Sequence, residues 1–265
     1  MTAADDPPSD GHPQERMIAG RGRVPSGSGL ILALVVPVIP TCATILNRLP
    51  VNTHLGLAAT WQFLDIALLI AFVRRSEAGD WVSLGVRRFA FADVIAVIGA
   101  CLFWLTADGL ITRVCVHRLP FTTTTVIQAI RPERSALTGL PGFAPYPNLA
   151  STAFLLTGAI MEELGSRAYL IERMRSRGIW FAGAASLGAS VLMHIPAWGL
   201  DAFWRAPNLA LLIILYIFRP SLIACSITHF IIDILIEYPG AVPPQVLLWR
   251  FRLEGLRPGF AGHAH

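Results

Sequence analysis

Residues 157–167 read Thr-Gly-Ala-Ile-Met-Glu-Glu-Leu-Gly-Ser-Arg and place three charged side chains inside an apolar stretch. A charge at the centre of a membrane-spanning helix costs roughly 2.5–3.5 kcal/mol, so such residues are usually functional or paired. Glu163 and Arg167 are spaced i, i+4 with the acid on the N-terminal side, the favourable order for a helical ion pair. Glu162 points about 100° away from Glu163 on a helix. We therefore expect Glu162 to be free to face the interior of a bundle.

The composition of the chain indicates that this stretch lies in lipid. Of the 265 residues, 54% are hydrophobic and 14% are charged, whereas soluble domains carry about 25% charged residues, and the mean hydropathy is +0.57. A bilayer is spanned by about 20 apolar residues. The windows that reach or approach this length are Gly29–Leu46, His54–Val73, Ala92–Val116, Asn148–Met174, Gly178–Trp198, Leu200–Phe218 and Pro220–Tyr238. The sequence therefore predicts an all-α fold, a polytopic transmembrane helical bundle of about seven spans.

The regions around these windows follow from the same reading. We expect a disordered cytoplasmic tail at 1–28, N-terminal transmembrane helices at 29–116, a loop at 117–147, a core of further transmembrane helices at 148–238 and a C-terminal tail at 239–265. More arginines fall in the loops that an N-inside orientation places in the cytoplasm. A net charge of +4 suits loops that lie against anionic lipid, and arginines scattered between apolar spans argue against nucleic acid as a partner. We expect an integral protein of a bacterial inner (plasma) membrane.

Two later spans carry histidines. His194 closes the fifth span in Ser190-Val-Leu-Met-His, and His229 lies in the last span with Asp233 four residues further on. His229 and Asp233 therefore share one helical face, and a neighbouring carboxylate commonly fixes the tautomer of a histidine. Each residue alone is explained by packing or by a buried ion pair. Their presence on three spans of one bundle indicates a single polar site.

These residues resemble the CPBP family of CAAX proteases and bacteriocin-processing enzymes, which includes the type II CAAX prenyl endopeptidases. The family motifs EExxxR, FxxxH and HxxxN match at Glu162, Glu163 and Arg167, at His194, and at His229. Two positions depart from the motifs: Ser190 stands for the Phe and Asp233 for the Asn. We expect Ser190 to affect packing only. Asp233 matters more, because an amide can donate a hydrogen bond and an ionised carboxylate cannot.

The resemblance implies an intramembrane endopeptidase that cleaves membrane-associated polypeptides near their C-terminus by glutamate-activated water. Glu162 with His194 would activate the water as general base, and His229, supported by Asp233, would stabilise the oxyanion. Glu163 and Arg167 would give structural support. This version needs no cofactor, and its partners are membrane lipid and a membrane-associated or lipidated peptide substrate.

Three alternatives stay open at this point. Zinc is possible, with Glu162, His194 and His229 as a three-ligand set that leaves one position open, although the chain has no HExxH motif. A non-proteolytic bacteriocin-immunity or scaffold membrane protein would share the same fold. A transporter would use the same ionisable residues as a proton relay.

Overall fold

The structure is a computed structural model, and it describes residues 26–39, 51–76, 81, 84–118, 146–198, 202–203 and 205–238. Within these ranges every regular element is a helix, so the all-α prediction is confirmed. The predicted tail up to residue 25, the predicted loop from 119 to 145 and the predicted C-terminal tail lie outside the described residues. So does the last part of the first predicted span, residues 40–46.

The helices follow the predicted windows with small shifts. They are α2 (Gly27–Leu30), η1 (Ile31–Val35), α4 (Val51–Ser76), α5 (Phe91–Arg118), α7 (Leu149–Glu162), η3 (Glu163–Ile171), α8 (Glu172–Met174), η4 (Arg175–Arg177), α9 (Ile179–Trp198), α10 (Ala206–Phe218) and α11 (Leu222–Glu237). The first helix begins two residues inside the predicted tail, and α10 begins at Ala206 and not at Leu200. A proline occupies the first turn of α10, where a missing N–H costs nothing because that group has no partner within the helix.

Hydropathy supports a membrane crossing for one helix in the described part of the chain. Residues Asn52–Ser76 of α4 are long and apolar enough, with a mean hydropathy of 1.8 over the best window. The apolar stretches Phe91–Ala107, Ile179–Ile195 and Ala206–Phe218 are shorter. At 13 residues, α10 extends only about 20 Å, less than the hydrocarbon core of a bilayer.

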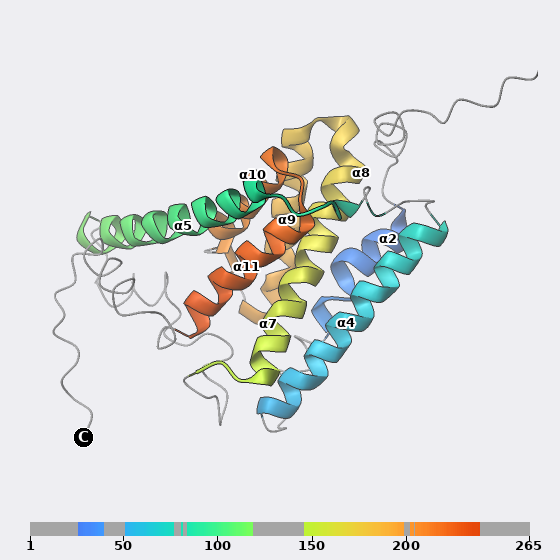
Figure 1. Cartoon of the computed structure of the whole chain (residues 1–265), viewed down its shortest axis with the longest axis horizontal. Coiled ribbons are helices and arrows are strands. Elements are labelled where there is room, and N and C mark those ends of the chain that lie inside the picture. The colour runs from blue at the N-terminus through green and yellow to red at the C-terminus, as the bar shows by residue number, and fades with distance from the viewer. Residues whose placement is uncertain are drawn as a thin grey trace, which may run out of the picture.

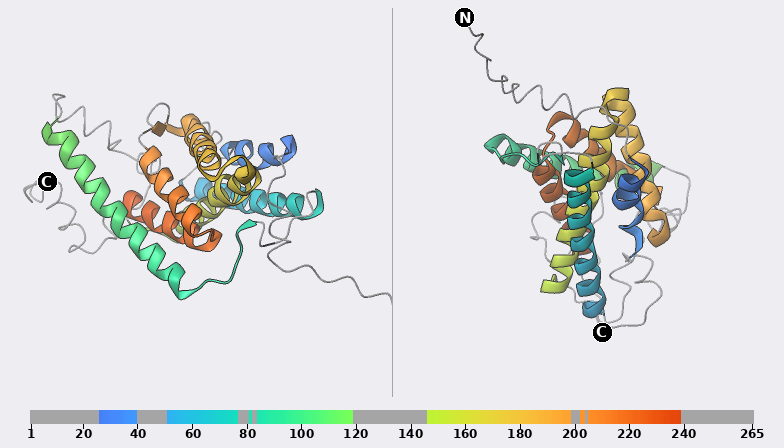
Figure 2. Two further views of the ribbon diagram at one scale, coloured as in Figure 1. Left: turned by 90° about the horizontal axis from the view of Figure 1, so that it is seen from above. Right: turned by 90° about the vertical axis from the view of Figure 1, so that its right-hand side faces the viewer.

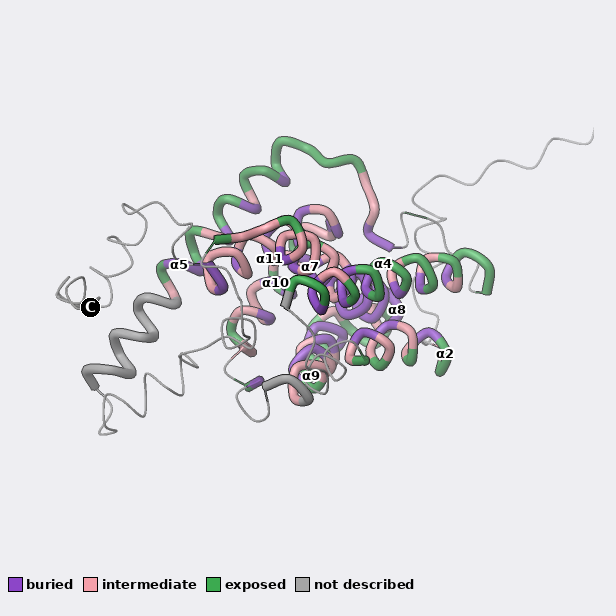
Figure 3. The backbone as a smooth tube through the Cα atoms, turned by 90° about the horizontal axis from the view of Figure 1, so that it is seen from below, coloured by how far each residue is buried: buried purple, intermediate pink, exposed green. Residues whose placement is uncertain are grey.

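The helical run α7–η3–α8 lies at the centre of the bundle (Figure 1). α4 packs along α7, α11 packs on α7 and η3, and both α9 and η1 pack against η3. α5 lies on the outside and packs against α11 and α10 (Figure 2). Buried residues gather in the middle of the bundle, while the outward faces of α4 and α5 are exposed (Figure 3). The charged motif at 162–167 is therefore held in the most enclosed part of the molecule.

The segment η3 is a π-helix of nine residues, all of them buried. The hydroxyl of Ser166 donates to the carbonyl of Glu162, a local bond that competes with the backbone ladder. Gly165 lets η1 approach closely, because a Cβ at this position would collide with the carbonyl oxygen of Ala33. π-helical turns within α-helices are rare and are frequent at functional sites. Here the π-helix begins at Glu163, the second carboxylate of the EExxxR motif.

Candidate active site

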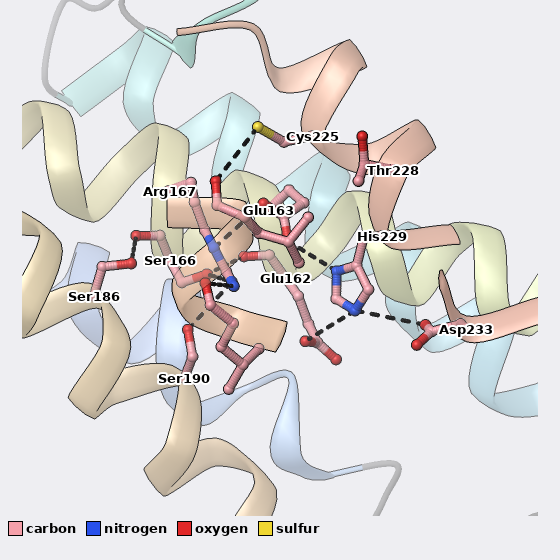
Figure 4. Close-up of polar contacts among 12 residues, drawn as sticks. Glu162, Glu163, Ser166, Arg167, Ser186, Ser190, Cys225, Thr228, His229 and Asp233 are labelled. Carbon is pink, nitrogen blue, oxygen red and sulfur yellow. Dashed lines mark hydrogen bonds and ion pairs between the residues drawn. The ribbon is translucent and has the colours of Figure 1, made fainter. Parts of the chain in front are cut away.

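Side chains from α7, α9 and α11 meet at Glu162. Its Oε2 lies 3.6 Å from Nε2 of His194 and 3.9 Å from Nε2 of His229 (Figure 4). Both distances exceed the 2.7–3.2 Å or so of a direct N–H···O hydrogen bond. The Glu162 and His194 side chains are 19% and 18% exposed, so the group is enclosed and still reachable.

Hydrogen bonds on the far nitrogens fix the orientation of both rings. Nδ1 of His194 lies 2.7 Å from the backbone carbonyl of Ser190, and Nδ1 of His229 lies 2.8 Å from Oε1 of Glu163. A carbonyl or a carboxylate oxygen accepts, so each Nδ1 carries the proton and donates it. In the neutral rings the Nε2 lone pairs of both histidines are therefore directed towards Glu162.

Glu163 and Arg167 form a buried ion pair, with Nε of Arg167 3.3 Å from Oε2 of Glu163 and both side chains 0% exposed. The pair expected from the i, i+4 spacing is thus present. The other donors of Arg167 reach the hydroxyl of Ser166, the hydroxyl of Ser190 at 3.2 Å and the carbonyl of Leu209 at 3.5 Å. A buried charge is tolerated only when it is paired and hydrogen-bonded in this way.

The structure shows that Glu163, and not Asp233, holds Nδ1 of His229. Asp233 lies on the other side of the ring, with Oδ2 3.5 Å from Nε2, the nitrogen that also faces Glu162 (Figure 4). The two adjacent glutamates therefore contact opposite sides of one imidazole. The angle of about 100° between Glu162 and Glu163 on a helix did not predict that both would contact one histidine. They do so because the ring of His229, which comes from another helix, lies between their two diverging side chains.

The expectation that Ser190 affects packing only was wrong. Its hydroxyl accepts a hydrogen bond from Arg167, its carbonyl accepts one from His194, and the residue is 0% exposed. Ser186, one turn earlier on α9, donates to the carbonyl of Ser166 at 2.7 Å. Two serines spaced i, i+4 in an apolar span are the sequence signal that would have indicated a polar face on α9 opposite Arg167.

The residues that a zinc ion would use are the three that meet at Glu162. Glu162, His194 and His229 offer donor atoms of the types that zinc binds. Across the ranges that the structure describes, however, no group of three or more His, Cys, Asp or Glu side chains is placed so that it could hold a metal ion.

A comparison with protein families agrees with this geometry. Residues 145–235 match the family model described as Type II CAAX prenyl endopeptidase Rce1-like. The matched range begins four residues before α7 and ends two residues after Asp233, so it includes every residue of the candidate site. The match covers the region of the candidate site and points to the class of CAAX-type intramembrane proteases, a membrane-embedded family.

Over residues 145–235 the chain is similar to the type II CAAX prenyl endopeptidases of the CPBP family, in agreement with the motifs. No curated protein and no solved structure matches the chain. The assignment therefore depends on the family model and on the residues that the structure brings together.

Proposed function

We propose that the protein is a polytopic intramembrane endopeptidase that cleaves membrane-associated polypeptides near their C-terminus with water activated by Glu162. The convergence of two histidine Nε2 atoms on one oxygen of Glu162 carries this proposal. That oxygen, Oε2, is buried and accepts no hydrogen bond from the described residues. Polar groups separated by more than about 3.5 Å are commonly bridged by water. In our proposal, the substrate water is held between Glu162 and His194.

In the hydrolysis that we propose, Glu162 accepts a proton from this water as the water oxygen bonds to the scissile carbonyl carbon. The product of this step is a tetrahedral oxyanion and a protonated Glu162. When the intermediate collapses, the C–N bond breaks and Glu162 returns its proton to the leaving amine. Neutral His194, which donates through Nδ1 to Ser190, offers its Nε2 lone pair to the second hydrogen of the water.

The proposed role of His229 is to stabilise the oxyanion. The bond to Glu163 uses the proton on Nδ1, so Nε2 can donate to an oxyanion only when the ring is an imidazolium. Three carboxylates surround the ring and compensate that charge, those of Glu162, Glu163 and Asp233. In this version Asp233 acts through His229 and supports the imidazolium by its charge.

The exposed outer surface supports a membrane location for more helices than α4. Large apolar side chains on the outward faces of α4 and α5 are more than half exposed: Leu57, Phe63, Leu64, Leu68, Ile95, Ile98, Leu102 and Phe103. Exposed apolar surface of this extent is unusual for a protein in water, and hydrocarbon chains would cover it. We propose an inner membrane location with a cytoplasmic N-terminus.

Glu162→Gln tests the proposal with little change in shape. The variant and the wild type are expressed in the native membrane, and new peptide termini are identified by mass spectrometry. We expect termini that depend on the wild type and disappear with Glu162→Gln, and we expect the inactive variant to retain uncleaved substrates. Glu172→Gln is the matched control, because Glu172 pairs with Arg175 at 2.7 Å and lies outside the site. Identical termini with wild type and Glu162→Gln would exclude a glutamate-dependent protease.

Two further variants and a chelator separate the alternatives. His194→Ala should lower the rate by roughly 10²–10⁴-fold, the usual contribution of a group that assists proton transfer, whereas a scaffold or immunity protein would work normally without it. Asp233→Asn should keep more activity than Asp233→Leu, because the amide still contacts Nε2 of His229. Loss of activity in a strong chelator, with recovery on addition of zinc, would favour the metal alternative.

A further inference from the structure

A second cluster of charged residues lies where α5 begins and α10 ends, apart from the candidate active site. The carboxylate of Asp93 is 0% exposed and binds two arginines through Oδ1: Nε of Arg219 at 2.7 Å and Nη2 of Arg87 at 3.2 Å. Its Oδ2 accepts the backbone N–H of Ala90 at 2.7 Å. Two guanidinium groups share one carboxylate, so the cluster keeps a net positive charge.

Both arginines retain donors for another acceptor. Arg219 contacts Asp93 through Nε. Its two terminal NH2 groups take no part in that bond and can donate to another acceptor. Arg87 contacts Asp93 through Nη2, and no contact among the described residues uses its other terminal nitrogen. The side chains of Arg87 and Arg219 are 34% and 32% exposed. Asp93 therefore holds two guanidinium groups in fixed positions with part of each directed out of the protein.

Exposed aromatic residues flank this cluster in the sequence. Phe91 precedes Asp93 by two residues and is 78% exposed, and Phe218 precedes Arg219 directly and is 74% exposed. Exposed Phe side chains on a membrane-bound surface are buried at the boundary between the headgroups and the acyl chains. Guanidinium groups bind phosphate oxygens through paired N–H donors. Fixed arginines beside exposed phenylalanines match the two parts of a phospholipid, the phosphate and the start of the acyl chains.

The cluster is joined to the helix that carries His229. The backbone N–H of Leu222, at the start of α11, donates to the carbonyl of Gly85 at 3.0 Å. Gly85 has a φ of 68°, and a Cβ there would lie 2.7 Å from the hydroxyl of Tyr216 on α10. The segment before α5 therefore packs against α10 and bonds to the first turn of α11. A ligand that stabilises the cluster would stabilise the start of α11 as well.

We propose that Arg87 and Arg219, positioned by Asp93, bind the phosphate headgroup of an acidic phospholipid whose acyl chains cover Phe91 and Phe218. The inference rests on the membrane location proposed above and does not require proteolytic activity. Each arginine at an anionic lipid surface is expected to contribute about fivefold in affinity. A zwitterionic lipid brings a cationic group beside its phosphate, which the positive cluster repels.

Thermal unfolding of the full-length protein in an uncharged detergent tests the proposal. Dioleoyl-phosphatidylglycerol, dioleoyl-phosphatidylcholine and inorganic phosphate are titrated in parallel. We expect a saturable rise in Tm with phosphatidylglycerol and no rise with the other two. Arg87→Gln should raise the half-saturating concentration of phosphatidylglycerol about fivefold. Arg177→Gln, which removes an exposed arginine from η4 outside the cluster, should leave it unchanged.

A conservative variant guards against a simple loss of folding. Arg219→Lys keeps a charge beside Asp93 and should keep the Tm measured without lipid, while its ammonium loses the paired donors and phosphatidylglycerol binds more weakly. Three results would each refute the lipid site. The first is unchanged phosphatidylglycerol binding by Arg219→Lys, and the second is equal stabilisation by phosphatidylcholine or by phosphate alone. The third is a loss of phosphatidylglycerol affinity in Arg177→Gln as large as that in Arg87→Gln. The assay measures lipid binding, so its result does not depend on whether the protein is an active protease. Extraction of the chain from membranes by alkaline carbonate would separately refute the membrane location.

Discussion

Replacing Arg167 by Met leaves Glu163 as a buried charge with its cation removed. Both side chains are 0% exposed, so solvent does not screen the lost interaction. Breaking a buried pair by removing one partner costs about 3–5 kcal/mol. We expect Arg167→Met to lower the free energy of unfolding by that amount, which corresponds to a change of roughly 150- to 5,000-fold in the ratio of folded to unfolded protein.

The double variant Glu163→Gln/Arg167→Met tests the reason for this loss. The Gln side chain has no charge to compensate, and its amide oxygen still accepts a hydrogen bond from Nδ1 of His229. We therefore expect the double variant to be more stable than Arg167→Met alone, because neutral replacements of a buried pair are often tolerated. The expected order of stability is wild type, then the double variant, then Arg167→Met.

Unfolding by sodium dodecyl sulfate in mixed micelles, followed by tryptophan fluorescence, gives these free energies. Ser190→Ala is a useful control, because it removes one acceptor of Arg167 and leaves the ion pair in place. Its expected cost is about 1 kcal/mol. A loss below 1 kcal/mol for Arg167→Met, or a double variant no more stable than the single one, would refute the reasoning.

Two further predictions concern packing. Gly165→Ala should destabilise the protein by about 1–3 kcal/mol, since the new Cβ meets the carbonyl of Ala33. Gly99→Ala, where no atom lies within 4 Å of the new Cβ, should stabilise the protein by up to about 1 kcal/mol. The same unfolding assay compares the two variants. Trp104→Phe removes the hydrogen bond of 2.7 Å to Asn208 and should cost about 1 kcal/mol; equal stability of this variant and the wild type would show that the contact between α5 and α10 does not depend on it.

The positions of the helices could be predicted from the sequence because they depend on local apolar length. The window Asn148–Met174 corresponds to the continuous helical run α7–η3–α8, and Gly178–Trp198 corresponds to α9. The sixth window was less accurate, because Pro207 and the polar residues before it place the start of α10 at Ala206. The π-helix at η3 was not predictable from apolar spacing, since the same apolar run suits an α-helix and a π-helix.

Motif spacing by itself determined the residues of the site. It selected Glu162, His194 and His229, and it paired Glu163 with Arg167, because an i, i+4 ion pair depends only on the geometry of one helix. The resemblance to the CPBP family followed from the same spacing. All of these features are local to one span, or depend on chain order alone.

Only the tertiary structure decided which nitrogen of His229 each carboxylate contacts. Glu163 and Asp233 lie on opposite sides of the ring, and Ser190 contributes a polar contact to Arg167 where only packing was expected. These contacts join helices that are far apart in the sequence. Their side-chain directions depend on how α7, α9 and α11 rotate and pack against one another, and a pattern within a single helix contains no information about that rotation.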